Sequence, residues 1–230
     1  MASEELVRRG KTKDVYRLPN GLYRFHFKDD VTGHEDGKID PGGNAVVGKV
    51  TGMGEACLRM TKHLFAKIAH AGIPTHFVEA DAKAGTITVK PASMFGQGVE
   101  GVVRYVATGS FVRRYGLYVK EGMMFPAGLV ELTLKDDERG DPLITEDTLA
   151  ALGIMKPDEI RTVKEMALKA AGVVRDVLSA EGLTLYDLKF EFGLVDGKVA
   201  LVDESSPGSM RVYKGDEKLE ALVLAGYFKD

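Results

Sequence analysis

The stretch LYDLKFEFG constrains the fold more than any other part of the chain, because apolar and charged residues alternate along it. Phe190 and Phe192 alternate with Asp187, Lys189 and Glu191. A period of two is typical of a β-strand with one buried and one polar face. The pattern therefore predicts a strand whose acid, base and second acid share one face. That face is either solvated or the floor of a binding site.

The residues after this strand bring further carboxylates back toward it. Through a DG turn the chain returns as VALVDE. A two-residue turn sets Glu191 opposite Val202 and Asp203 opposite Phe190, whereas a three-residue loop with Gly197 left-handed sets Glu191 opposite Asp203. Paired carboxylates are unfavourable without a cation between them. Together with phosphate oxygens and waters they make a typical Mg²⁺ site, so Glu191 and Asp203 are candidate metal ligands.

The remaining pattern indicates an α+β chain with mostly antiparallel strands and a few helices. KDVYRL and LYRFHFKDD flank Asn20-Gly21, which predicts a hairpin. Helical spacing runs from about residue 54 to Gly72, and again from Pro157 to Gly182. Further strands are predicted at IPTHFVEAD, TITVKPA and LVELTLKDD, and GHEDGKIDPGGN is predicted to be a polar, glycine-rich loop.

Composition excludes several classes of protein. The chain has 230 residues, of which 44% are hydrophobic and 28% charged, and its net charge is −3. No basic footprint for nucleic acid is present, and no apolar run is long enough to span a bilayer. One cysteine, Cys57, fits a reducing compartment and reads as a core residue in a helical stripe. We expect a cytoplasmic protein without a signal peptide.

Two segments are candidate anion sites. RRGKTKDVY carries Lys11 and Lys13 beside a glycine, and RYVATGS places Arg104 and Ser110 around a glycine turn. Each also fits a solvated surface. GNAVVGKV nearly matches the phosphate-binding G-x-x-x-x-G-K-[ST] loop, but Val50 stands where a hydroxyl is needed, so we interpret it as the lead-in to a helix.

Seven motifs follow one another along the chain: GKTKDVY, FKDD, AGIPTH, VVR…TGSFVRRYG, KDDERGDPLI, DLKFEFG and DESSP…MRVY. In this order and spacing the chain resembles the SAICAR synthetase family over nearly its whole length. The resemblance implies two α+β lobes, residues 1–90 binding nucleotide and residues 91–230 carrying the metal and substrate site, with ATP between them. It implies an ATP- and Mg²⁺-dependent ligase that joins L-aspartate to 5-amino-1-(5-phosphoribosyl)imidazole-4-carboxylate through an acyl phosphate. Family members are commonly dimers or larger, so a homo-oligomer is expected.

The resemblance also implies roles for individual residues. ATP would be held by Lys11, Thr12, Lys13, Val15 and Lys90; Mg²⁺ by Glu191 and Asp203; the substrate phosphate by Arg104, Ser110 and Arg211; and Lys135, Lys189 and Asp187 would face the reacting groups.

Three internal parts of the sequence depart from the family. Gly208 replaces an aspartate near the substrate, FGQGVEG reads as a short insertion in place of a proline-containing connection, and the loop after FKDD differs. These changes leave open a divergent ligase for a related phosphorylated carboxylate or another amine. A small-molecule kinase and a non-catalytic nucleotide-binding regulator are the further alternatives, since lysines and carboxylates would serve them too.

Overall fold

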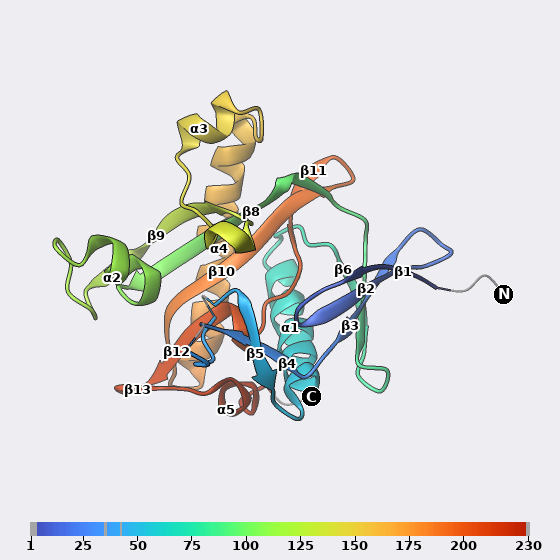
Figure 1. Ribbon diagram of the computed structural model, residues 1–230, viewed down its shortest axis with the longest axis horizontal. Helices are drawn as coiled ribbons and strands as arrows, with labels where there is room; N and C mark the ends of the chain where they lie inside the picture. The colour runs from blue at the N-terminus through green and yellow to red at the C-terminus, as the bar shows by residue number, and fades with distance from the viewer. Residues whose placement is uncertain (1–3, 35, 42, 229–230) are drawn as a thin grey trace.

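The computed structural model describes residues 4–34, 36–41 and 43–228, so the outermost ends of the two expected lobes lie outside the described residues. Two larger antiparallel sheets and one small sheet make up the β-structure (Figure 1). The five-stranded sheet has the order β1 (Glu5–Arg9), β2 (Lys13–Arg17), β3 (Tyr23–Phe27), β7 (Thr86–Val89) and β6 (Phe77–Asp81). The small sheet pairs β4 (Asp30–Gly33) with β5 (Ala45–Lys49).

The strands of the six-stranded sheet all follow those of the other two sheets in the sequence. The order of this sheet is β13 (Glu217–Lys218), β12 (Met210–Lys214), β10 (Thr184–Val195), β8 (Ser93–Val106) and β9 (Met124–Leu134), with β11 (Lys198–Val202) paired to β10. The long strands β8 and β10 cross the middle of the molecule in Figure 1. Because LYDLKFEFG lies within β10, the predicted alternation becomes one apolar face and one charged face of this sheet.

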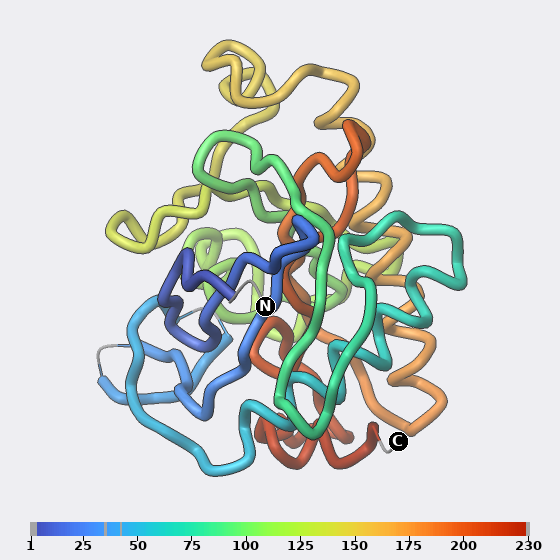
Figure 2. The backbone as a smooth tube through the Cα atoms, turned by 90° about the vertical axis from the view of Figure 1, so that its right-hand side faces the viewer, coloured from blue at the N-terminus to red at the C-terminus, as the bar shows by residue number. Residues whose placement is uncertain are grey.

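Helix α4 (Pro157–Ala180) covers the apolar face of this sheet, and the second long helix, α1 (Met53–His70), packs against α4 and the five-stranded sheet. Helix α4 begins at a proline and ends before left-handed Gly182, as predicted, and its buried stripe packs on β10 and β8. Helix α1 ends before Gly72 and contributes Phe65 and other apolar side chains to the core that includes the buried stripe of α4. Turned by 90°, the blue N-terminal strands and the orange α4 lie on opposite sides of the molecule (Figure 2). The shorter helices are α2 (Gly109–Tyr115), α3 (Glu146–Ala151) and α5 (Ala221–Ala225), with 3₁₀ turns at Asp137–Arg139 and Pro207–Ser209.

The β10–β11 hairpin has the two-residue turn, so the three-residue alternative is wrong. Val195 pairs with Lys198 and Glu191 pairs with Val202. Both turn residues between β10 and β11 have positive φ, as a type I′ turn requires, so no extra residue is left to form a bulge. One further step of this ladder would set Asp203 opposite Phe190 and turn its side chain toward the core. Instead β11 ends at Val202, and Asp203 has a left-handed φ of 64°, which redirects it.

Two segments differ from the sequence interpretation. GNAVVGKV forms strand β5 instead of a plain lead-in to α1, because pairing with β4 satisfies its backbone. FGQGVEG is not a connection between elements, because it lies inside β8. There Val99 pairs with Phe192 while Met94 pairs with the next residue, Gly193, so residues 95–98 bulge out of the ladder.

Candidate functional site

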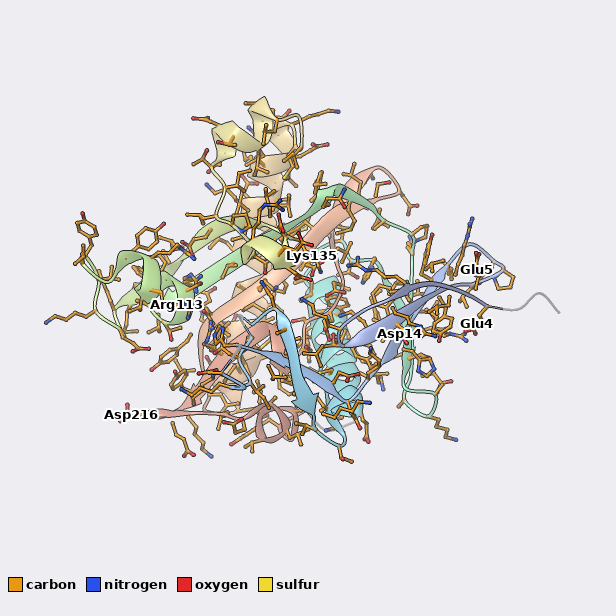
Figure 3. The ribbon with its side chains drawn as sticks, in the orientation of Figure 1. Glu4, Glu5, Asp14, Arg113, Lys135 and Asp216 are labelled. Carbon is orange, nitrogen blue, oxygen red and sulfur yellow. The ribbon has the colours of Figure 1, made fainter. Side chains whose placement is uncertain are left out.

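A cleft of about 370 Å³ lies along the charged face of the six-stranded sheet. Its lining combines the loop before β2, the residues around β4 and β5, the charged face of β10, and the segment after β11. Figure 3 labels Lys135 near the middle of the molecule, just beyond β9, and Asp14 on β2 of the other sheet. Of the predicted site residues, the lining includes Lys11, Thr12, Lys13, Val15, Lys135, Lys189, Glu191 and Asp203, together with Gly208.

Two glutamates sit side by side on the cleft floor. Glu191 on β10 is directly opposite Glu100 on β8. Lys135 forms an ion pair with Glu191, and Lys189 Nζ is 2.7 Å from Glu100 Oε1. The like-charged pair is therefore tolerated because each carboxylate has its own lysine. Thr133 also donates a hydrogen bond of 2.8 Å to Glu100.

The predicted partner of Glu191, Asp203, enters the cleft from the end of the hairpin. Its Oδ1 is 3.1 Å from Lys13 Nζ, and the same ammonium contacts Glu204 Oε1 at 2.7 Å. Because Lys13 lies on the five-stranded sheet, these ion pairs join that sheet to the residues after β11. The left-handed turn at Asp203 is what lets the two-residue hairpin still bring this carboxylate toward Glu191.

The pKa shifts follow from burial and from these contacts. Burial and the charge of Asp203 raise the pKa of Glu191. Burial alone would raise the pKa of Asp203, but Lys13 and Lys135 outweigh it and lower that pKa to about 2. Burial would lower the pKa of Lys13, yet Asp203 and Glu204 raise it instead. At neutral pH the site thus holds Asp203 ionised against a charged Lys13.

The carboxylates fit a divalent cation that is also bound by a nucleotide. Asp203 and Glu191 offer hard oxygen donors, and Glu204 Oε2 is a buried oxygen without a hydrogen-bond partner. Across residues 4–34, 36–41 and 43–228, no three His, Cys, Asp or Glu side chains form a metal cluster on their own. The protein ligands are thus too few for a closed site, which agrees with the expected sharing of Mg²⁺ with phosphate oxygens and waters.

The predicted ATP residues lie in the loop before β2 and in β2 itself, except for Lys90. Gly10 N donates to Lys13 O, and a Cβ at Gly10 would come within 2.4 Å of that oxygen, so the turn requires glycine. Lys11 Nζ is 2.7 Å from Asp137. Lys90 is not part of the cleft lining; its ammonium is 3.0 Å from Asp196 at the hairpin turn.

The three residues predicted to hold the substrate phosphate converge although they are distant in sequence. Arg104 and Arg211 contact the same oxygen of Asp187, at 2.8 and 2.7 Å, and Arg104 donates a hydrogen bond of 2.9 Å to Ser110. Arg211 also binds Asp40 at 2.5 Å. Both guanidiniums are almost fully buried and already face carboxylates.

Gly208 has open space beside it. A Cβ there would meet only Ser206 Oγ, at an ordinary distance of 3.5 Å. Ser206 and Ser209 are the nearest hydroxyls in sequence that could take the place of the missing carboxylate, but they are hydrogen-bonded to each other and within the 3₁₀ turn. Asp187 is held by the two arginines.

Sequence reasoning missed Glu100, Glu204 and Asp40 as members of this site. Glu204 stands next to Asp203, so its adjacency was a usable signal. Glu100 could be found only from the β8–β10 register, and Asp40 only from the position of the β4–β5 loop.

A cleft in which lysines from two sheets face buried carboxylates, with an arginine cluster joined to its lining through Asp40, defines an enzyme that handles phosphorylated, anionic small molecules. Comparison with known proteins identifies the family to which this enzyme belongs. Residues 6–222 match the SAICAR synthetase family, and the chain belongs to that family. It is 50% identical over 221 residues to the phosphoribosylaminoimidazole-succinocarboxamide synthase of Clostridium tetani, covering 95% of this chain and 96% of that one.

Other relatives support the same family assignment. The synthase of Thermotoga petrophila is 39% identical over 209 residues, covering 90% of this chain and 85% of that one. A solved SAICAR synthetase in complex with ADP superposes with a TM-score of 0.82 at 30% identity, covering 96% of this chain and 93% of that one. Another solved SAICAR synthetase gives a TM-score of 0.79 at 38% identity, covering 91% and 86%.

These matches confirm the predicted family, the predicted α+β fold and the prediction of an ATP-dependent ligase of purine biosynthesis. The ADP-bound relative supports the use of ATP. None of the helices among the described residues is both long and apolar enough to cross a membrane.

Proposed function

We propose that this cleft joins L-aspartate to 5-amino-1-(5-phosphoribosyl)imidazole-4-carboxylate at the expense of ATP. One observation carries the proposal: Lys13, Lys135 and Lys189 meet Glu191 and Asp203 in a single cleft of a chain that belongs to the SAICAR synthetase family. Lysines from two sheets can hold phosphates and a carboxylate together. Such positioning and charge neutralisation are what phosphoryl transfer requires.

The reaction proceeds in two steps. A carboxylate oxygen of the ribotide attacks the γ-phosphorus of ATP, which gives an acyl phosphate and releases ADP. The neutral amine of aspartate then attacks the acyl carbon, the C–O bond to phosphate breaks, and the amine loses a proton as inorganic phosphate leaves. Lys135 and Lys189, at the cleft floor, stabilise the negative charge on the reacting oxygens. No nucleophilic side chain is needed.

Mg²⁺ would be held by Asp203 and Glu191 with oxygens of ATP, with Glu204 as a neighbouring donor, and would supply charge neutralisation for the transferred phosphoryl group. Lys11, Thr12 and Lys13 bind the ATP phosphates, and Val15 lies against the adenine. Lys90 has this role only if it releases Asp196, since the two are ion-paired.

The ribotide phosphate binds Arg104, Ser110 and Arg211. Arg211 is ion-paired with Asp187 and Asp40, and Arg104 with Asp187 and Glu131, so the dianionic phosphate must replace one of the two carboxylates on Arg211. Asp40 is the candidate for release, since it lies in the β4–β5 loop whereas Asp187 belongs to the central strand β10. Asp187 then remains to fix both arginines, beside the reacting groups.

Several wider expectations belong to the same proposal. Residues 1–90 form the nucleotide-binding lobe and residues 91–230 the metal and substrate lobe, which fits the division of strands between the two larger sheets. The enzyme works in the cytoplasm as a homo-oligomer.

Gly208 favours one second candidate, a ligase of the same chemistry acting on a related phosphorylated carboxylate or another amine. The testing experiment incubates the purified chain with ATP, Mg²⁺, L-aspartate and the carboxylated imidazole ribotide, and measures ADP and amide product together. Equal amounts of both, with neither formed when the ribotide is omitted, are expected. ADP release with a different carboxylate, and none with the ribotide, would select the second candidate.

A further inference from the structure

A left-handed backbone turn brings Asp203 into the cleft, and one side chain from a distant part of the sequence holds that turn. Strand β11 ends at Val202, so the sheet ladder no longer fixes the next residue. The carbonyl oxygen of Asp203 lies 3.0 Å from Nε2 of His76. Since a carbonyl can only accept, Nε2 must carry the proton and donate.

His76 is itself fixed by its surroundings. Its backbone N–H donates to Leu201 O at 3.0 Å, and its carbonyl accepts from Lys90 N at 2.7 Å. Its ring is buried, with edge-to-face contacts to Phe25 and Phe65 at centroid distances of 5.6 and 6.0 Å. The ring therefore has one orientation, and its N–H points at one backbone carbonyl.

The register of the hairpin makes the backbone conformation of Asp203 decide where its carboxylate points. Without the turn, Asp203 would follow the ladder opposite Phe190 and face the core. Left-handed φ is uncommon for a non-glycine residue, and although aspartate tolerates it better than most, a contact to its backbone helps to hold it there. Lys13 attracts the carboxylate, whereas the hydrogen bond from His76 acts on the carbonyl of the same residue.

We propose that His76 is a positioning residue for the reaction: by donating from Nε2 to the Asp203 carbonyl, it holds the left-handed turn that directs this carboxylate into the cleft. This inference rests on the proposed metal role of Asp203. It also links residues 74–76 of the N-terminal part to the metal carboxylate of the C-terminal part, through a hydrogen-bonded contact with β11.

The test compares two substitutions that differ in hydrogen-bond donation. His76→Phe keeps an aromatic ring but removes the donor, whereas His76→Gln retains an N–H at a similar reach. His26→Phe, the same change at an exposed histidine of β3, is the matched control. The probe is Mn²⁺, titrated in the presence of saturating ADP and followed by the electron paramagnetic resonance signal of the free ion.

We expect His76→Phe to bind Mn²⁺ about tenfold more weakly, as for other residues that orient a metal ligand. His76→Gln should recover most of the affinity, and His26→Phe should match the unmodified chain. Equal weakening in the Phe and Gln variants would overturn the proposal, because ring packing would then be responsible. An unmodified chain that binds no Mn²⁺ refutes the metal role of Asp203 and this inference with it, whereas unchanged binding in His76→Phe refutes the inference alone.

A measurement on the unmodified chain covers the case in which His76→Phe does not fold. Two-bond ¹H–¹⁵N correlation spectra of ¹⁵N-histidine-labelled protein distinguish the two neutral tautomers. The Nε2–H tautomer is expected for His76. The Nδ1–H tautomer would contradict the proposal, since no donor would then face the Asp203 carbonyl.

Discussion

Replacing Asp203 by asparagine separates the role of its charge in stability from its role in catalysis. The pKa of this carboxylate is lowered from 3.8 to about 2, in spite of burial, mainly by Lys13. A lowered folded-state pKa means that the stabilisation is present above the unfolded pKa and is lost as pH falls toward the folded one. The lowered pKa corresponds to a contribution of about 2 kcal/mol to the free energy of unfolding at neutral pH, and to about half of that at pH 3.

Asp203→Asn should therefore lower the free energy of unfolding by at most about 2 kcal/mol at pH 7. The substitution also removes the repulsion between the carboxylates of Asp203 and Glu191, which offsets part of the loss. At pH 3 the difference in the free energy of unfolding between this variant and the unmodified chain should be about half as large as at pH 7. Turnover should fall by orders of magnitude while the protein stays folded, because a metal ligand is lost. Asparagine tolerates left-handed φ, so the backbone turn itself is preserved.

Urea unfolding at both pH values and an ADP-release assay make these measurements. Asp196→Asn is the matched control, since it is the same substitution at another left-handed position of the same hairpin, but with an exposed side chain. It should change stability and turnover little. Near-normal turnover in Asp203→Asn would remove this residue from the metal site, and a stability difference that does not depend on pH would refute the electrostatic reasoning.

Three further predictions concern the other parts of the cleft. Arg211→Ala should raise KM for the ribotide much more than KM for ATP, and steady-state kinetics showing equal increases would assign Arg211 to the fold or to ATP. Gly208→Asp should stay folded and active, because a Cβ there meets no close contact, and complete loss of activity would contradict the open space described. Chelation of Mg²⁺ by EDTA should abolish ADP release but shift the melting temperature only slightly, since Lys13 and Lys135 still neutralise the carboxylates; a large drop in melting temperature would indicate a structural metal instead.

The sequence was most informative where one residue pattern determines one structure. Alternation in LYDLKFEFG correctly predicted the charged and apolar faces of β10, because a period of two leaves a strand no other arrangement beside a core. The spacing of apolar residues predicted α1 and α4, and glycines after both helices marked their ends. These are local properties of the chain.

The sequence was least informative where contacts are made between distant segments. The opposition of Glu191 and Glu100 depends on the β8–β10 register, which shifts at the bulge of residues 95–98. The position of Asp203 depends on a left-handed turn and on His76, more than a hundred residues earlier. Asp40 reaches Arg211 from a glycine-rich loop with no regular period. None of these contacts follows from local propensity.

The transfer of an oxygen atom tests the central claim, that this cleft activates a carboxylate through an acyl phosphate. The ribotide is prepared with ¹⁸O in both carboxylate oxygens and turned over with ATP, Mg²⁺ and L-aspartate, and the released phosphate is analysed by mass spectrometry. The account predicts one ¹⁸O in each phosphate, because the oxygen that attacks phosphorus leaves with it, and one ¹⁸O retained in the amide. Phosphate without label, formed together with amide product, would contradict the account.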